Sequence, residues 1–164
     1  MSFPELAAGK LSALLDRQAS RDVYDASRLL GTPFDPVAFR CALVVLRAMS
    51  RRDPLDDALE QVTVDHREAR QKLLPLLRQE ERILLDQGAE WIDQLVESCR
   101  DRLKALLPWR DPEREFLVRF RRHGELLPSL LTTDVGLQQW ILEHPALRWR
   151  LLNIRRSADF RRGP

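Results

Sequence analysis

The chain has 164 residues, 44% of them hydrophobic and 32% charged, so it can bury a core beneath a strongly ionised surface. Its formal net charge of +2 argues against nucleic-acid binding through a uniformly basic surface. No apolar run approaches the roughly 20 residues of a membrane span, and the N-terminus lacks a signal-peptide pattern. We therefore expect a cytoplasmic protein with no membrane contact, in which Cys41 and Cys99 are buried free thiols.

The first two predicted helices lie within the first 31 residues. Four aliphatic residues recur at intervals that place them on one buried helix face: Ala7, Leu11, Leu14 and Leu15. A second, short helix is predicted to begin at Arg21 with Ser20 as its N-cap. Gly31 and Pro33 are typical of its end.

Two aspartate–proline pairs mark the next helix starts. Asp35, followed by proline, predicts an N-cap for a helix over residues 36–49. That segment is apolar nearly all round, which is typical of a central core helix. Asp53, also followed by proline, repeats the signal, and Asp56 and Asp57 are expected near a positive helix end.

The middle of the chain carries a cap, a break and a long helix. Asp65 and Glu68 have capping-box spacing, although aspartate replaces the usual hydroxyl residue. Pro75 is expected to kink or split the helix that follows. Residues 88–107 are predicted to form one long amphipathic helix.

Three further helices are predicted towards the C-terminus. One begins at Asp111 and stops at Gly124, and another is capped by Thr133 and closed by Pro145. Residues 146–156 form the last, and the residues after it are expected to be loose. Since no stretch is typical of a strand, we predict an all-α protein with one compact multi-helix domain.

Chemistry-bearing residues gather in the opening stretch AGKLSALLDRQASRDVYD. Lys10 and Arg17 are seven residues apart and lie nearly above one another on a helix. Arg21 and Asp22 fall at the start of the second helix, where unpaired N–H groups favour an anion. Such a set could hold a triphosphate through charge-assisted hydrogen bonds. A solvated helix face with exposed ion pairs is the alternative from spacing alone, and it remains open.

Two stretches extend this interpretation by resemblance. ELAAGKLSALLDRQASRDVYD and, near the other end, HPALRWRLLNIR resemble motifs of the AbiEii/AbiGii-type nucleotidyltransferase toxins. The resemblance implies that Lys10 contacts the nucleotide triphosphate and that Asp22 is the acidic residue of the last active-site motif. It also implies that Arg17 and Arg21 are supporting cations and that Asp25 is structural.

The resemblance further implies a division of the chain. Members of this family have an upstream α/β core that carries a Gly-Ser turn and a D-x-D pair, and the D-x-D pair binds the magnesium that aligns and neutralises the transferring phosphates. No such pattern occurs in this sequence, so no metal ligand is assigned. We expect residues 1–30 to be part of an active site and residues 31–164 a helical domain. The chain is then the C-terminal half of a truncated or split enzyme, inactive alone, with Mg²⁺ required only beside the missing N-terminal half.

Two hypotheses of different classes follow. In the first, the chain is an incomplete nucleotidyltransferase of a toxin–antitoxin or phage-defence system, with an NTP as substrate and tRNA as a possible acceptor. Four C-terminal arginines then contact RNA or, alternatively, form a solvated face: Arg148, Arg150, Arg155 and Arg156. In the second, it is a non-catalytic helical module that binds an antitoxin or another protein. Trp109, Trp140 and Trp149 are then candidate anchors, although buried core tryptophans are commoner.

Overall fold

The computed structural model describes residues 3–31, 35–57, 62–86 and 90–162, and these are helical with no strand among them. The predicted all-α class is therefore confirmed. The α-helices are α1 (Phe3–Arg17), α2 (Ser20–Leu29), α3 (Pro36–Met49), α4 (His66–Glu68), α5 (Gln79–Asp86), α6 (Glu90–Leu103), α7 (Asp111–Val118), α8 (Val135–Glu143) and α9 (Pro145–Arg162).

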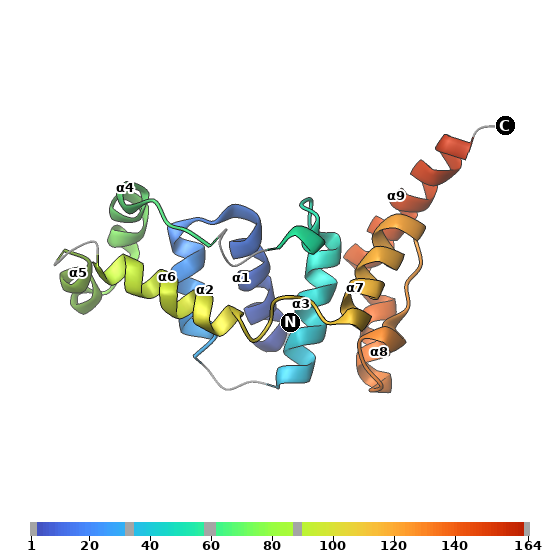
Figure 1. Cartoon of the computed structure of the whole chain (residues 1–164), viewed down its shortest axis with the longest axis horizontal. Helices are drawn as coiled ribbons and strands as arrows, with labels where there is room; N and C mark the ends of the chain where they lie inside the picture. Colours follow the sequence, from blue (N-terminus) through green and yellow to red (C-terminus); the bar gives the residue numbers. More distant parts are fainter. Residues whose placement is uncertain (1–2, 32–34, 58–61, 87–89, 163–164) are drawn as a thin grey trace.

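The helices form an elongated arrangement in three parts (Figure 1). The α1–α2 hairpin and α3 lie in the middle, and α4 and α5 lie at one end. Helix α6 runs from that end back along α2, while α7, α8 and α9 form the opposite end, from which α9 projects. The C-terminal end of α3 therefore lies between the hairpin and the α7–α9 layer.

A shared core holds the hairpin and the C-terminal layer on α3. The predicted apolar face of α1 is confirmed, since Ala7, Leu11, Leu14 and Leu15 are all at most 2% exposed. Helix α3 is the central core helix, as predicted, and its Val44 and Val45 are fully buried. The same cluster extends to Leu147 of α9, while a smaller cluster joins η3 (Ala69–Leu73) to α6. Cys41 and Cys99 are buried free thiols, as expected.

Helix starts follow the sequence signals with two corrections. Asp35 caps α3 and Asp65 caps α4, as predicted. The N-cap of α2 is Ala19 and not Ser20, because the tight turn after α1 brings Ser20 into the helix itself. The N-cap of α8 is Asp134 and not Thr133, because the Asp134 carboxylate accepts a hydrogen bond from the Leu137 N–H group at 2.7 Å.

Other predicted boundaries move by a few residues. Pro75 lies in a short 3₁₀ turn, η4 (Leu74–Leu76), so the predicted break is confirmed. The long helix expected over 88–107 begins at Glu90 and ends at Leu103 within the described residues. Gly124, in the left-handed conformation with φ 65°, ends the segment that begins at Asp111. The last helix continues to Arg162. The prediction that the helix ends at residue 156 and is followed by a loose tail is therefore wrong for residues 157–162.

Candidate functional site

The turn between α1 and α2 sets the geometry of the opening segment. Gln18 has a positive φ of 54°, and its N–H donates to the Leu14 carbonyl at 2.9 Å, which ends α1. Two residues later α2 begins and runs back along α1. Because Lys10 and Arg17 are two turns apart on α1, both can reach across to α2.

Two ion pairs cross the hairpin. The Lys10 ammonium lies 2.7 Å from the Asp25 carboxylate, and the Arg17 guanidinium lies 3.1 Å from that of Asp22. The cations are accessible, with 36% of the Lys10 side chain and 66% of the Arg17 side chain exposed, whereas only 7% of the Asp22 side chain is. We call these four residues the α1–α2 seam.

The structure shows which of the predicted site residues contact one another. Asp25, expected to be structural, is the partner of Lys10, while Asp22 holds Arg17. Arg21 is exposed and forms no ion pair within the described part of the chain.

The N-terminus of α2, where an anion was expected, already contacts a carboxylate of the protein. The Ser20 N–H donates to Glu68 Oε2 at 3.1 Å, and Glu68 comes from α4, 48 residues along the chain. Asp65 caps α4 by accepting from the Glu68 N–H at 2.7 Å. Half of the predicted capping box is therefore present at α4, while the Glu68 side chain serves α2 instead.

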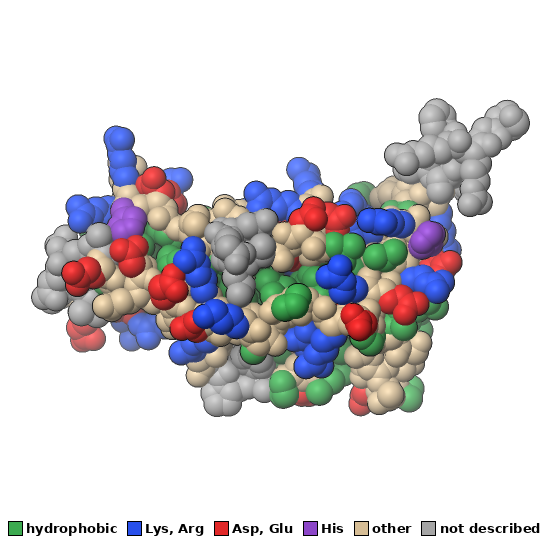
Figure 2. Space-filling model, in the orientation of Figure 1, with side chains coloured by type: hydrophobic (Ala, Val, Ile, Leu, Met, Phe, Trp, Pro, Cys, Tyr) green, Lys and Arg blue, Asp and Glu red, His purple; other side chains and the backbone are tan. Residues whose placement is uncertain are grey.

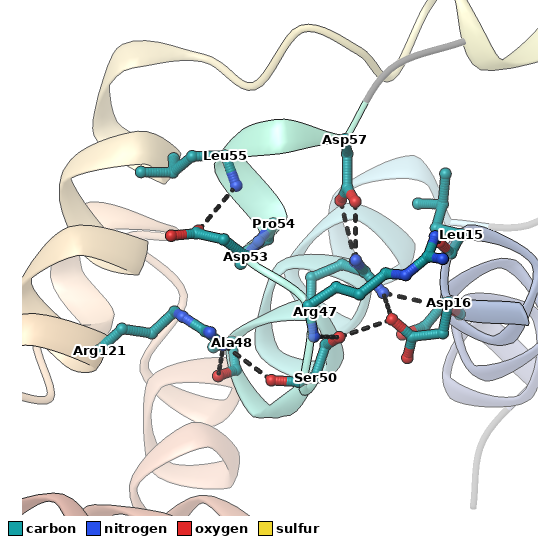
Figure 3. Close-up of polar contacts among 12 residues, drawn as sticks. Leu15, Asp16, Arg47, Ala48, Ser50, Asp53, Pro54, Leu55, Asp57 and Arg121 are labelled. Atoms are coloured by element: carbon teal, nitrogen blue, oxygen red, sulfur yellow. Dashed lines mark hydrogen bonds and ion pairs between the residues drawn. The ribbon is translucent and has the colours of Figure 1, made fainter. Parts of the chain in front are cut away.

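A buried arginine lies behind the hairpin (Figure 3). Arg47 of α3 is fully buried, and its guanidinium binds Asp16 at 2.6 Å and Asp57 at 2.7 Å. It also donates to the Ser12 carbonyl at 3.2 Å, while the Ser50 hydroxyl donates to Asp16 at 2.6 Å. This Arg47 network ties α1 to the chain that follows α3.

Burial and hydrogen bonding move the pKa values in the Arg47 network. Burial acts to raise the pKa of Asp16, but hydrogen bonds from Ser50 and Arg47 outweigh it, so this pKa lies below its ordinary value. Burial raises the pKa of Asp57 to about 6, although the Arg47 guanidinium opposes the shift. Asp57 was expected at a positive helix end. It instead follows the single 3₁₀ turn η1 (Pro54–Asp56), where Arg47 reaches it.

The buried charges on α3 were missed by the sequence analysis. Arg40 pairs with buried Glu113 and donates to the carbonyls of Ala105 and Leu106, each at 3.2 Å. Arg47 lies seven residues further along the same helix. Two arginines seven residues apart on an otherwise apolar helix could have predicted these buried ion pairs, because each guanidinium must find acceptors once the helix is buried.

The described residues bring together no three His, Cys, Asp or Glu side chains that could hold a metal ion. Asp53, Asp56 and Asp57 line one hollow. However, Asp53 accepts from the Leu55 N–H, Asp57 binds Arg47 and Asp56 also has an interaction, so none of the three carboxylates is free. The described residues therefore do not fit the magnesium of a nucleotidyl transfer.

The C-terminal candidates divide between buried and exposed positions. Trp109 is 4% exposed and donates to the Pro54 carbonyl at 2.6 Å, so it is a core residue. Trp149 is 66% exposed. Among the arginines, Arg155 donates to the Gly124 carbonyl, and the buried Arg150 Nε has no hydrogen-bond partner in the part of the chain that the structure describes.

The seam and the fold define an all-α protein with a charged hairpin near its N-terminus. Residues 1–107 match the family described as "Nucleotidyl transferase AbiEii toxin, Type IV TA system". The match contains the whole α1–α2 seam and spans more than half of the chain, so the chain belongs to this family, as the resemblance implied. No curated protein and no solved structure matches it. Within the described residues, no helix is long and apolar enough to cross a membrane.

Proposed function

We propose that this chain is the helical part of a nucleotidyltransferase and that the α1–α2 seam receives the triphosphate of an NTP. The observation that supports this most is that two ion pairs, Lys10–Asp25 and Arg17–Asp22, join α1 to α2. Both lie inside the part of the chain that matches the family. The carboxylates hold both cations at one edge of the hairpin, where solvent reaches them. Charge-assisted hydrogen bonds from such cations are strong ones for phosphate oxygens.

The four proposed site residues have different parts in this arrangement. Lys10 and Arg17 bind the phosphates, and exposed Arg21 adds a third cation at the start of α2. Asp22 orients Arg17 and is the proposed acidic residue of the motif, which accepts a hydrogen bond or proton from the substrate. Asp25 contacts Lys10 directly, so its geometry makes it a second candidate for that role.

The remaining machinery is proposed from the family pattern. We propose that an N-terminal half supplies the Gly-Ser turn and the D-x-D carboxylates, which would hold Mg²⁺ and so provide neutralising charge for the phosphates. We also propose that residues 1–30 form part of the active site and that residues 31–164 form a helical domain. A tRNA end in the cytoplasm is the proposed acceptor, in a toxin–antitoxin or phage-defence setting. This chain alone is then expected to transfer no nucleotide, and co-expression of the N-terminal half is expected to restore transfer to tRNA.

Nucleotide binding by a Lys10→Ala variant tests the seam. We expect a fluorescent NTP analogue to bind about tenfold more weakly, because one charge-assisted hydrogen bond contributes about 1.5–3 kcal/mol. Lys104→Ala is the matched control, since Lys104 also pairs with one aspartate, Asp101, at 2.6 Å on an exposed helix face. Equal affinities of the wild type and the Lys10→Ala variant would contradict the assignment.

A second candidate function rests on the exposed face of α9. Trp149 and Leu152 are 66% and 54% exposed and lie three residues apart on one side of the helix. We propose that this face binds the antitoxin protein, in keeping with the toxin–antitoxin family. Trp149→Asp is expected to abolish co-purification of the product of a neighbouring antitoxin gene. Retained co-purification would exclude this face.

A further inference from the structure

An open groove runs along the partly buried side of α1 that faces α3, next to the seam. Gly9, Ala13 and Arg17 lie four residues apart on that face, so small side chains form part of its floor. The groove has a volume of about 760 Å³. We call it the α1–α3 groove, and its lining is Gly9, Ser12, Ala13, Asp16, Arg17, Leu46, Met49, Ser50, Arg51 and Arg52.

The groove carries more positive than negative charge. Arg17, Arg51 and Arg52 line it, and all three are exposed, although Arg17 also forms the ion pair with Asp22. Asp16 also lines it, but Arg47 and Ser50 already bind that carboxylate. Figure 2 shows Lys and Arg side chains, beside acidic ones, along the edge of the molecule above the end of α3.

More cations approach this corner from the C-terminal layer. Arg121 donates to the carbonyls of Ala48 and Ser50, at 3.2 and 2.8 Å, and so satisfies the end of α3 (Figure 3). Burial lowers the pKa of Arg121, and the positive charges of Arg150 and Arg47 add to the shift. Arg121 therefore occupies the carbonyls of Ala48 and Ser50 at the end of α3, while Arg52 donates to the Leu15 carbonyl of α1 at 3.3 Å.

The lining joins cations to an apolar wall. Ala13, Leu46 and Met49 supply apolar surface beside the three arginines. Arginines suit phosphate oxygens, and apolar side chains suit the face of a sugar or base, so the combination fits a nucleotide chain. The groove is open along its length and thus suits a strand lying across it better than an enclosed mononucleotide.

We propose that the α1–α3 groove binds the phosphate backbone of a single-stranded nucleic acid, with Arg51 and Arg52 as its main contacts. This proposal rests on the proposed function, because the strand would be the acceptor of the nucleotide. Arg17 lines the groove and also belongs to the seam, so the two sites adjoin at that residue. A strand end in the groove would lie next to a triphosphate on the seam.

Salt-dependent RNA binding by the full chain tests the proposal. The probe is a short fluorescently labelled single-stranded RNA, measured by anisotropy over a range of salt concentrations. For the Arg51→Gln/Arg52→Gln variant we expect the slope of log K against log salt to fall by about 1.4, since each lost phosphate contact removes about 0.7. Affinity near physiological salt is then expected to fall roughly tenfold. The matched control is Arg67→Gln/Arg70→Gln, an equal charge change at exposed positions at the α4 end of the molecule.

The outcomes separate this proposal from the proposed function. If the salt slope of the Arg51→Gln/Arg52→Gln variant equals that of the wild type, the proposed RNA binding in the groove is wrong. It is also wrong if the control variant loses as much RNA affinity. Loss of NTP binding with unchanged RNA binding also overturns it, because the arginines would then serve the triphosphate. RNA binding that depends on Arg51 and Arg52, with NTP binding indifferent to Lys10→Ala, supports the groove and overturns the seam. Arg51→Gln alone leaves the hydrogen bond from Arg52 to the Leu15 carbonyl intact, so it shows the same trend without risk to the fold.

Discussion

The Glu68 carboxylate accepts a hydrogen bond from the Ser20 N–H at 3.1 Å and thereby caps the helix that carries Asp22 and Asp25. The donor and acceptor are 48 residues apart, so the cap forms only when α4 packs beside the hairpin. Ser20 is 1% exposed, and its own hydroxyl has no hydrogen-bond partner among the described residues. The position of the seam therefore depends on a residue far from it in sequence.

Glu68→Ala is expected to destabilise the chain by about 1 kcal/mol, because the loss leaves a helix-start N–H group without its acceptor. Urea unfolding measures the change. Glu68→Gln retains an acceptor oxygen and should recover part of the loss, while Glu80→Ala, at an exposed position of α5, is the control. Equal stability of the Glu68→Ala variant and the wild type would show that this cap contributes nothing.

Arg47→Met is expected to cost roughly 3–5 kcal/mol, because it leaves buried Asp57 without its opposite charge. Adding Asp57→Asn removes the unpaired charge and should restore part of that stability. The free energy of unfolding by urea is the measurement, with exposed Arg114→Met as the control. A double variant as unstable as the single one would mean that packing, and not charge, dominates at this position.

His144 is expected to make stability depend on pH. Burial lowers the pKa of His144 from 6.5, and its Nδ1 accepts a hydrogen bond from the Leu147 N–H at 3.4 Å, which requires an unprotonated Nδ1. The unfolded chain therefore binds a proton at His144 more tightly than the folded chain does. The contribution of neutral His144 to stability is complete above pH 6.5 and falls as the pH drops towards the pKa of His144 in the folded chain.

His144→Asn supplies a cap acceptor that does not titrate. The difference in unfolding free energy between wild type and this variant should therefore shrink or reverse as the pH falls, and should be constant above pH 7. His123→Asn, at an exposed position, is the control. A difference independent of pH would place the relevant titration elsewhere.

Asp25→Asn is expected to tighten NTP binding about fivefold, because removing a negative charge near the phosphates relieves repulsion of about 1 kcal/mol. It also frees Lys10 from its present partner. Fluorescent NTP titration measures the change, with Asp101→Asn as the control because Asp101 pairs with Lys104. If Asp22→Asn tightens NTP binding more than Asp25→Asn does, Asp22 and not Asp25 is the carboxylate nearer the phosphates.

Much of the fold is determined locally and was therefore predictable from the sequence. The apolar spacing of Leu11 and Leu14, the aspartate–proline start of α3 and the stop at Gly124 depend on residues within a few positions of one another. The motif around Lys10 likewise predicted the family, and the family match contains that motif.

The pairings of charged residues were decided by tertiary structure. Sequence spacing placed Lys10 and Asp22 in one segment, but the hairpin turn at Gln18 brings Lys10 to Asp25 and Arg17 to Asp22. The partners of Arg47 arise because packing buries its guanidinium, and a buried charge must find opposite charges wherever the chain passes. Helix periodicity is set within one turn, whereas an ion pair across helices depends on how whole helices pack, so only the folded chain fixes it.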